Sequence, residues 1–348
     1  GLPLAREKAS KLRLVFFSRI NLAAVDDRNE KREKLNSPLS PPLSLSFPLP
    51  QGTVGHPRKR FYRARAHANP LSDGFYADLP DSPRDVAWED LYKEAFAVAR
   101  SRGEAAPRVT VADVGCGFGG LLTRLSPLTP RGELLVGLEL RSKVCDYVRQ
   151  RAAVARARAL AEQEERGAGG EEAEATKAEA TKAEATTTTT TTAKDPPPPP
   201  PSTTTPSPSP SCLNVSALRI NAQRHLVNLF EKHQLNKIFF LFPDPHFKAK
   251  NWRRRIVTPS SAAEFAYVLR PGGRLYTITD VEDLGRWMAG VLDDCAMFRR
   301  LSDDELAGDA AAGLLSVATE EGQKVARNGG RTFRACYERL ERARRLPE

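Results

Sequence analysis

Short apolar segments that alternate with helical stretches constrain the fold of this chain more than any other feature. The segments have the length of strands and are rich in Val, Ile, Leu and Phe. Strands and helices in alternation predict an α/β fold, in which right-handed crossovers connect the strands of a mostly parallel sheet. The five predicted strands are Val109–Val114, Leu134–Leu138, Val215–Ile220, Lys237–Phe242 and Arg274–Thr279. The helical stretches follow Gly119 and Ser142 and lie around Gln223–Glu231 and Ser260–Leu269.

Further elements are expected on either side of these five strands. A helix over Val86–Arg100 would place apolar side chains from Trp88 to Ala99 on one face and would end at Gly103. Near the C-terminus, Phe298–Leu301 and Arg331–Leu340 are suited to two more strands at an edge of the sheet. The sheet would then have seven strands.

Two segments of the 348-residue chain have compositions that oppose packing. Residues 1–57 contain the stretch NSPLSPPLSLSFPLP, and we expect them to form a disordered tail. Residues 152–212 begin as a continuation of the preceding helix, pass through two ATKAE repeats and run into tracts of Thr and Pro. Burial of so few large apolar side chains cannot offset the conformational entropy lost on ordering. We therefore expect one domain, residues 58–348, interrupted by a disordered insertion at about 152–212.

The charge balance favours an anionic partner. The chain carries a formal net charge of +10, and residues 161–212 alone contribute −5, so the rest carries +15. Such an excess favours a polyanion, with a solvated basic surface as the alternative. The apolar runs are too short for a membrane-spanning helix or a signal peptide, so neither a membrane nor secretion is expected. The five cysteines lack zinc-binding spacing, and we expect a reduced intracellular protein without a structural metal.

A glycine-rich turn follows the first predicted strand. The sequence VADVGCGFGG ends at Gly120, and its first, second and fourth glycines, beginning at Gly115, satisfy the dinucleotide-binding pattern G-x-G-x-x-G. A nicotinamide-dependent oxidoreductase is therefore one interpretation. Asp113 and the remaining glycine extend the pattern to D-x-G-x-G-x-G, which resembles the first motif of class I S-adenosylmethionine-dependent methyltransferases. Glycines allow the backbone to approach such a ligand closely, because a Cβ atom would block it.

The ends of the second and third predicted strands carry polar residues that suit a nucleoside. Glu139 lies 24 residues beyond Gly115, where an acidic side chain can accept hydrogen bonds from both ribose hydroxyls. Arg141 either belongs to this site or is a surface residue that caps the next helix. Asn221 and Ala222 follow the third strand, where an amide beside a small residue suits the edge and face of an adenine ring. An N-cap role for Asn221 is the alternative.

The fourth predicted strand leads into the most distinctive segment, IFFLFPDPHFK, which ends at Lys248. Two prolines bracket Asp244 at the carboxyl end of this strand and fix the backbone where open α/β sheets bind their ligands. A simple strand terminus would not require an acid between prolines followed by His and Lys. We therefore interpret Asp244 as a residue that lies where the sheet binds a ligand.

Together with the glycine-rich turn, this segment makes the chain resemble the tRNA (guanine-N7-)-methyltransferase family in its eukaryotic form. The resemblance covers nearly all of the residues expected to fold, and the PDPHFK string is highly specific. The matching segments are Lys59–Asp73, Gly115–Gly120, Asn221–Ala222, Phe242–Lys248, Leu275–Val281, Ala318–Lys324 and Arg327–Gly330. The long insertion and the basic stretch Asn251–Arg255 depart from the family pattern, which affects the expected loop geometry rather than the reaction.

The resemblance implies the class I S-adenosylmethionine-dependent methyltransferase fold, with a Rossmann-like, mostly parallel seven-stranded sheet and S-adenosylmethionine as cofactor. It places the catalytic acid at Asp244. The cofactor contacts that it implies are Gly115, Glu139, Arg141, Asn221, Ala222, Leu241, Thr319 and Glu321. The implied partners are tRNA and a noncatalytic WD-repeat propeller subunit in a heterodimer, and the implied localisation is the nucleus.

The implied reaction transfers a methyl group from S-adenosylmethionine to N7 of a variable-loop guanine in tRNA. Basic residues beside Asp244 suit the RNA backbone, because phosphate contacts give affinity without sequence information. The predicted RNA-binding residues are His246, Lys248, Lys250, Arg253, Arg254 and Arg255. Further basic clusters lie at residues 58–65 and 339–345. Two alternatives are a noncatalytic RNA-binding subunit, against which the intact motifs argue, and the oxidoreductase, for which no hydride-transfer site is recognisable.

Overall fold

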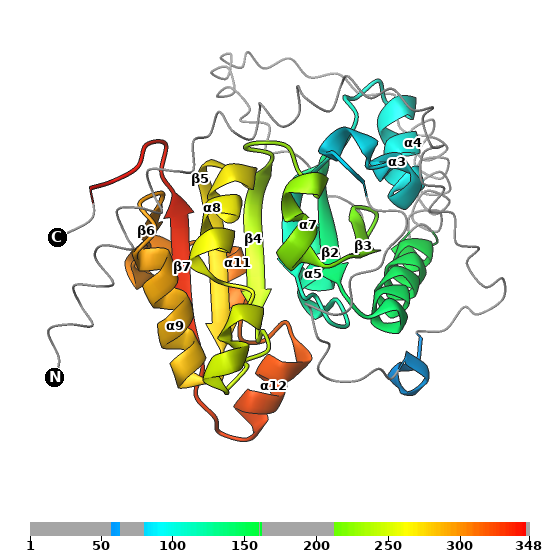
Figure 1. Ribbon diagram of the computed structural model, residues 1–348. Coiled ribbons are helices and arrows are strands. Elements are labelled where there is room, and N and C mark those ends of the chain that lie inside the picture. The colour runs from blue at the N-terminus through cyan, green and yellow to red at the C-terminus, as the bar shows by residue number, and fades with distance from the viewer. Residues whose placement is uncertain (1–56, 63–79, 160, 162–211, 346–348) are drawn as a thin grey trace, which may run out of the picture. The chain divides into compact units, whose positions relative to one another are not determined.

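The structure, a computed structural model, describes residues 57–62, 80–159, 161 and 212–345 (Figure 1). By its contacts the chain divides into two units, Gly1–Pro42 and Leu43–Glu348, and all of the described residues lie in the second. The predicted tail at residues 1–57, apart from its last residue, and most of the predicted insertion lie outside the described residues.

The described residues form a seven-stranded sheet with the strand order β3-β2-β1-β4-β5-β7-β6 (Figure 1). The strands from β3 to β5 are parallel, and β7 runs antiparallel to both β5 and β6. The strands are β1 (Arg108–Val114), β2 (Glu133–Glu139), β3 (Val215–Arg219), β4 (Leu235–Leu241), β5 (Leu269–Thr279), β6 (Phe298–Arg300) and β7 (Phe333–Arg339). All seven predicted strands are confirmed, and the sheet has the predicted class I methyltransferase arrangement.

The order of the strands reverses between β1 and β4. After β1 the chain adds β2 and β3 on one side, and it then returns to place β4 and β5 on the other side. In open α/β sheets the crevice at such a reversal, outside the carboxyl ends of the strands, is where ligands bind. The residues that follow Val114 and Leu241 therefore flank the position where a site is expected.

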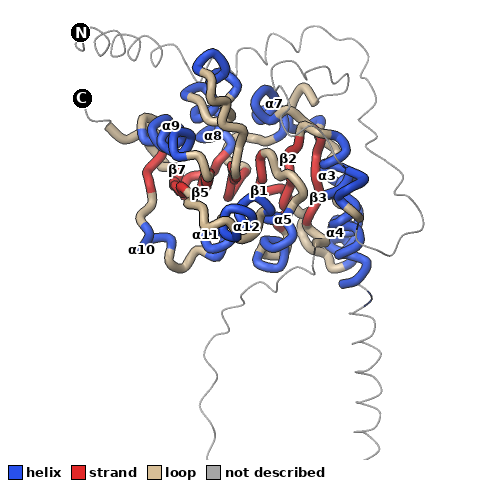
Figure 2. Tube along the Cα trace, turned by 90° about the horizontal axis from the view of Figure 1, so that it is seen from below, coloured by secondary structure: helices blue, strands red, loops and turns tan. Residues whose placement is uncertain are grey.

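Helices cover both faces of the sheet, as the view along the sheet edge shows (Figure 2). On one face lie α7 (Ala222–Leu229), α8 (Pro259–Val268) and α9 (Glu282–Asp293). On the other face lie α5 (Gly120–Leu125), α11 (Ala310–Leu314) and α12 (Glu320–Arg327). The described part of the chain also contains short elements: η1 (Lys59–Tyr62), η2 (Pro83–Asp85), η3 (Ser126–Leu128), η4 (Ala249–Arg254) and α10 (Asp303–Leu306). None of the helices in the described ranges is long and apolar enough to cross a membrane.

Alternate side chains of β4 enter the two hydrophobic layers. Ile238 and Phe240 belong to the core cluster that also contains residues of α7, α8 and α9, whereas Phe239 belongs to the cluster on the opposite face. Phe240 packs on Phe265 of α8 with ring centroids 4.6 Å apart, and Phe239 stacks on Tyr276 at 4.6 Å. Burial on both faces explains why the strand is a continuous apolar run rather than an alternating one.

The helix predicted over Val86–Arg100 is two helices, α3 (Trp88–Leu91) and α4 (Lys93–Ser101). Tyr92 lies between them with φ −133°, its side chain is fully buried, and its hydroxyl donates a hydrogen bond of 2.8 Å to the Leu135 carbonyl of β2. The prediction of a single helix was therefore wrong, because this tertiary contact competes with helix continuation. The expected end at Gly103 is confirmed by its φ of +65°.

The helix that follows β2 extends into the segment expected to be an insertion. Residues 142–159 are helical, Ala152 is buried, and Arg156 donates a hydrogen bond of 3.2 Å to the Val215 carbonyl of β3. At the other end, Cys212 is buried and its N–H donates to the Ser126 hydroxyl at 2.7 Å. The helix continuation expected at the start of this segment therefore packs against the domain through Ala152 and Arg156.

Candidate functional site

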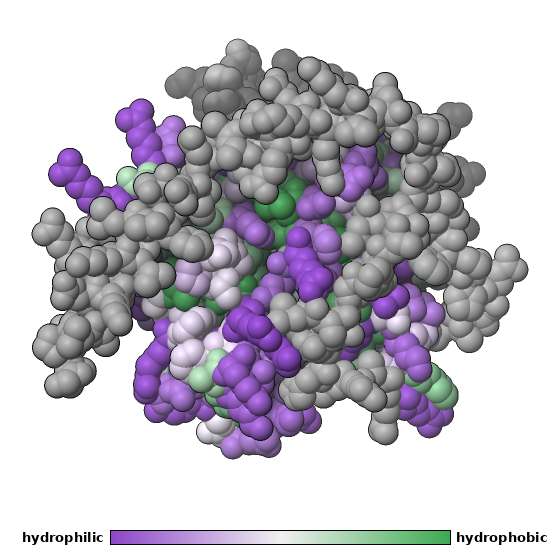
Figure 3. Space-filling model, in the orientation of Figure 1, coloured by the Kyte–Doolittle hydropathy of each residue, from purple (hydrophilic) through white to green (hydrophobic). Residues whose placement is uncertain are grey.

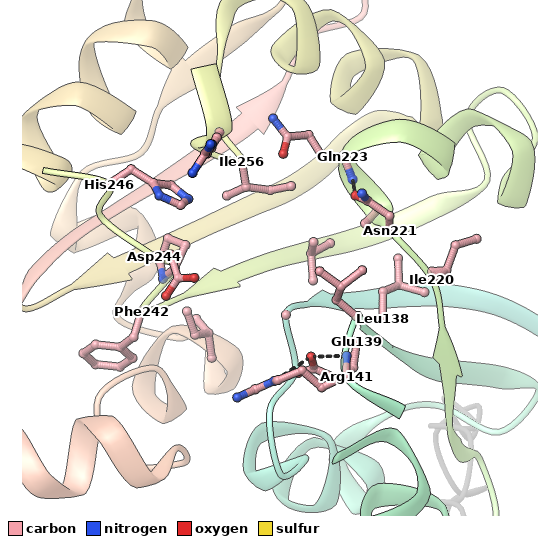
Figure 4. Close-up of a pocket in the computed structure, with 17 residues that line it drawn as sticks. Leu138, Glu139, Arg141, Ile220, Asn221, Gln223, Phe242, Asp244, His246 and Ile256 are labelled. Carbon is pink, nitrogen blue, oxygen red and sulfur yellow. Dashed lines mark hydrogen bonds and ion pairs between the residues drawn. The ribbon is translucent and has the colours of Figure 1, made fainter. Parts of the chain in front are cut away.

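A cavity of about 200 Å³ lies at the carboxyl ends of β1 to β4, where the strand order reverses (Figure 4). The four strand ends contribute Gly115, Glu139, Asn221 and Leu241 to its lining. The segment after β4 contributes Asp244 and His246, and further lining residues are Arg141, Ala222, Gln223, Arg254 and Ile256. Figure 4 shows Asp244 and His246 on one side of the cavity and Glu139 and Arg141 on the other.

The glycine-rich turn brings the backbone to this cavity. Gly115 has φ +75°, which disfavours any other residue, and a Cβ atom there would meet no described protein atom within 4 Å. The open space beside Gly115 is therefore available to a ligand. At Gly120 the constraint is the opposite, because a Cβ atom would lie 2.2 Å from the Ala318 carbonyl oxygen. Gly120 thus permits the close approach of the segment that leads into α12.

Glu139 is buried at the end of β2, with its carboxylate held by its neighbours. It accepts hydrogen bonds from the N–H of Gly117 at 3.2 Å and from the N–H of Arg141 at 2.9 Å. The Arg141 guanidinium adds a bidentate pair with two contacts of 3.0 Å (Figure 4). The hydrogen bonds to Glu139 raise the pKa of Arg141 above its usual range. Arg141 is therefore a lining residue and not merely a surface cap.

Asp113 of β1 is a further buried acid close to Glu139, and the sequence singled it out only as part of the glycine motif. It is 2% exposed. Burial, assisted by the charge of Glu139, raises the pKa of Asp113 to about 7. The carboxyl end of β1 therefore holds a buried acid whose charge depends on pH in the neutral range.

Asn221 combines the two roles that the sequence left open. Its side chain accepts a hydrogen bond of 3.1 Å from the Gln223 N–H at the start of α7, so it is the N-cap of that helix, and it also lines the cavity. Ala222 beside it also lines the cavity. Gln223 lines the cavity too, and the sequence gave no sign of it beyond its position after Ala222.

The turn after β4 has an unusual backbone. Phe242 and His246, which bracket Pro243, Asp244 and Pro245, have φ values of +50° and +47°, a region that non-glycine residues seldom occupy. The prolines fix two further φ angles between them. Such conformations persist only where the surroundings hold them, and they concentrate at functional sites. The result is that Asp244 is presented to the cavity on a rigid turn (Figure 4).

The structure separates the six predicted RNA-binding residues into three groups. Lys248, Lys250 and Arg253 are exposed on and around η4. His246 and Arg254 line the cavity, and the buried Nε of Arg254 has no hydrogen-bond partner among the described residues. Arg255 is only 5% exposed, so it does not share the exposed surface of the first group. Its guanidinium packs against the rings of Trp252 and Trp287.

Exposed aromatic side chains, to which the sequence pattern assigns no role, accompany the exposed basic ones. Phe247 is 73% exposed and Trp252 is 40% exposed. Figure 3 shows hydrophilic side chains gathered on the lower part of this face, where Figure 1 draws α9 and α12. An aromatic surface among cations is typical of single-stranded nucleic-acid binding, because bases stack on such rings.

Two predicted cofactor residues do not line the cavity. Thr319 is the N-cap of α12, where its hydroxyl accepts a hydrogen bond of 3.0 Å from Gly322 N–H. Glu321 is exposed, with Lys324 3.7 Å away. The adjacent Glu320 forms an ion pair with Lys59 of η1. Thr319 and Glu321 therefore lie outside the lining of this cavity as the described residues form it, and their contacts with the cofactor stay predictions. Of the other basic clusters, Arg339 is buried, and residues 63–65 lie outside the described ranges.

Comparisons with known proteins show what this chain is similar to. A family model described as "Putative methyltransferase" matches residues 205–335. The chain is 43% identical over 288 residues to the tRNA (guanine-N(7)-)-methyltransferase of Arabidopsis thaliana, a match that covers 83% of this chain and 94% of that protein. It is 40% identical over 315 residues to the tRNA (guanine-N(7)-)-methyltransferase of Yarrowia lipolytica, with 90% of this chain and 87% of that protein covered. Among solved structures, the 16S rRNA methyltransferase KamB is 18% identical, with a TM-score of 0.34 over 70% of this chain and 92% of that chain.

Proposed function

This chain belongs to the tRNA (guanine-N(7)-)-methyltransferase family, and on that premise we propose that it transfers a methyl group from S-adenosylmethionine to N7 of a variable-loop guanine in tRNA. The observation that carries the proposal is the placement of Asp244, on a rigid turn that faces the cavity opposite Glu139 and Arg141 (Figure 4). Neither a noncatalytic subunit nor a nicotinamide-dependent enzyme is favoured, since both relatives named above are methyltransferases.

The lining of the cavity fits the cofactor. Gly115 leaves open space for a ligand beside the backbone, Glu139 offers a carboxylate for ribose hydroxyls, and Asn221 with Ala222 offers an amide and a small side chain for adenine. When it is bound, S-adenosylmethionine supplies a methyl group on a positively charged sulfur. The residues of the chain then have to hold the acceptor in line with that methyl group.

The chemistry of the acceptor sets what the protein must do. Guanine N7 carries a lone pair and no proton, so no general base is needed to activate it. Catalysis can therefore consist mainly of positioning, to which the orientation of bound reactants can contribute up to about 7 to 11 kcal/mol. A rigid turn for Asp244 is what such a mechanism requires.

Asp244 suits the base that is methylated. Its carboxylate can accept hydrogen bonds from the N1–H and the N2 amino group of guanine, which are donors on the edge opposite N7. The positive charge that develops on the base strengthens this contact, so the carboxylate stabilises the transition state more than the ground state. His246 and Arg254, which line the cavity beside it, can contact the sugar or phosphate of the same nucleotide.

The exposed residues Lys248, Lys250 and Arg253 would bind the RNA backbone. Backbone contacts supply affinity that falls with salt and carries no sequence information, and RNA is recognised largely by its shape and by accessible bases. The resemblance to eukaryotic members further supports a WD-repeat propeller subunit as partner and the nucleus as location. Co-purification with a propeller subunit and imaging of the tagged protein in cells test these two points.

The reaction itself is tested by mass spectrometry of nucleosides after the protein has been incubated with unmodified tRNA and S-adenosylmethionine, with and without a propeller subunit. We expect 7-methylguanosine from the variable loop. Methylation at another guanine atom, or no methylation under either condition, would contradict the proposal.

A further inference from the structure

We propose that Arg255 is a positioning residue, which holds the turn that carries Asp244 instead of contacting RNA. The inference rests on the proposed function, because it concerns how Asp244 is kept in place for the guanine. It assigns different roles to neighbouring arginines of one basic stretch, which the sequence alone presents as equivalent.

The first observation is the environment of the guanidinium. Arg255 is 5% exposed, whereas Arg253, two residues earlier, is exposed. The Arg255 guanidinium carbon lies 5.0 Å from the ring centroid of Trp252 and 4.9 Å from that of Trp287. The two indole rings are 5.3 Å apart and inclined by 51°. A cation packed against two indole rings is stabilised by both, and it would have to leave them to reach a phosphate.

The second observation is the hydrogen bond that this guanidinium makes. The Nε–H of Arg255 donates to the carbonyl oxygen of Pro245 at 2.9 Å, and Pro245 directly follows Asp244. Pro243 and Pro245 have no backbone N–H, so the turn cannot use those groups to hold itself. Instead, the turn is held at its Pro245 carbonyl by the side chain of Arg255, the C-cap residue of η4.

The third observation is that the residues around Arg255 are themselves anchored to two helices. Gln223 of α7 donates from Nε2 to the backbone carbonyls of Arg253 and Arg255, at 3.2 Å in each case. The indole N–H of Trp287 in α9 donates to the Val257 carbonyl at 2.8 Å. The turn after β4 is thus connected through Arg255 to the rigid layer of helices behind it.

The turn has a physical need for this support. Phe242 and His246 both occupy the left-handed region, with φ values of +50° and +47°, although neither is glycine. Without an external contact the turn would relax toward ordinary conformations, because the left-handed region is unfavourable for residues with a Cβ atom. Relaxation would move Asp244 away from the position that it needs to hold the base.

The test compares Arg255→Ala, Arg255→Lys and Arg253→Ala in the complete protein, with a propeller subunit if activity requires one. We expect Arg255→Ala to lower kcat at saturating tRNA by roughly 10- to 100-fold, the cost of a misplaced catalytic group. The Kd for tRNA, its dependence on salt and the Kd for S-adenosylmethionine should stay unchanged. In contrast, Arg253→Ala should raise the Kd for tRNA and reduce the salt slope by up to about 0.7 to 0.9 for a lost phosphate contact.

Arg255→Lys keeps the charge and a donor but loses the planar group that packs against the indoles, so it should fold and still lose most of the kcat. Adding ethylguanidinium to Arg255→Ala should restore part of the kcat, which a general loss of packing would not allow. A reduced salt slope with normal kcat in Arg255→Ala would overturn the proposal, as would full activity of Arg255→Lys. Absence of 7-methylguanosine with the wild-type protein would instead refute the proposed function and this inference with it.

Discussion

Glu139 accepts hydrogen bonds from Gly117 and Arg141. These bonds hold the carboxylate at a fixed position in the cavity lining. If the ribose of the cofactor donates to it, replacing Glu139 by Gln should weaken binding of S-adenosylmethionine by about 1 to 3 kcal/mol, the scale of hydrogen bonds to a charged group. Calorimetry measures the Kd for S-adenosylmethionine. Glu282→Gln, an exposed acid of α9, is the matched control, and equal affinity in both variants would exclude the ribose role.

The raised pKa of Asp113 predicts how the stability of the fold depends on pH. Its pKa is raised to about 7 by burial and by Glu139, so the folded protein binds this proton more tightly than the unfolded chain does. The stability that Asp113 contributes is then fully present below about pH 4, the usual range of a carboxyl group, and is lost as the pH rises through 7.

The measurement is urea unfolding of the wild type and Asp113→Asn at several pH values. Between pH 5 and pH 8 the wild type should lose about 1 to 3 kcal/mol of unfolding free energy relative to Asp113→Asn, which has no proton to lose. Parallel pH profiles for the two proteins would mean that Asp113 is ionised throughout this range.

At the scale of elements, the turn after β4 and η4 form the surface on which the RNA prediction depends. Lys248, Lys250 and Arg253 are exposed there, whereas Arg255 is not. Replacing the three exposed residues by Ala should weaken binding to different tRNAs by a similar factor. It should also reduce the salt slope by about 0.7 to 0.9 for each phosphate contact that is lost. Binding titrations at several salt concentrations decide this, and an unaltered slope would move the RNA site elsewhere.

The strands could be predicted because burial on both faces leaves continuous apolar runs, and the PDP turn could be predicted because prolines restrict the backbone wherever they occur. The division of the predicted helix at Tyr92 could not be predicted. It depends on a hydrogen bond from the Tyr92 hydroxyl to the Leu135 carbonyl, which is distant in the sequence. Arg253 and Arg255 could not be distinguished from the sequence either, because the difference depends on a residue that is distant in the chain. Only the fold brings Trp287 of α9 against Arg255.

Thr319 and Glu321 were predicted from family resemblance alone. Their positions depend on how α12 packs beside the glycine-rich turn. Neither the hydrophobic periodicity nor the spacing of motifs in the sequence predicts this packing. The contact between Gly120 and the Ala318 carbonyl brings this segment near the turn, yet Glu321 points to the surface. The roles of Thr319 and Glu321 in cofactor binding therefore stay predictions from the resemblance.

At the scale of the whole molecule, we expect that the insertion between the helix over residues 142–159 and β3 can be shortened. Arg149 and Arg156 of that helix donate to carbonyls of β3, at 2.8 Å and 3.2 Å, so the helix lies along the strand that follows the insertion. Replacing residues 165–208 by a short flexible linker should change the unfolding free energy by about 1 kcal/mol or less, because loop-closure entropy varies only logarithmically with length.

Thermal or urea unfolding and methyl transfer to tRNA check this deletion. The matched control removes residues 152–159 instead, which eliminates buried Ala152 and the Arg156 contact and should destabilise the fold clearly. Loss of activity in the first deletion with its stability preserved would assign a role in the reaction to the acidic, repetitive segment.

The central claim is that Asp244 acts on the guanine and not on the cofactor. The most direct measurement compares Asp244→Ala with the wild type for two quantities: the rate of 7-methylguanosine formation in tRNA, and the Kd for S-adenosylmethionine by calorimetry. The account predicts that transfer is abolished while the Kd stays close to the wild-type value, because Glu139, Gly115 and Asn221 still line the cofactor side of the cavity. A variant that still methylates tRNA, or one that loses cofactor affinity along with the rate, would contradict it.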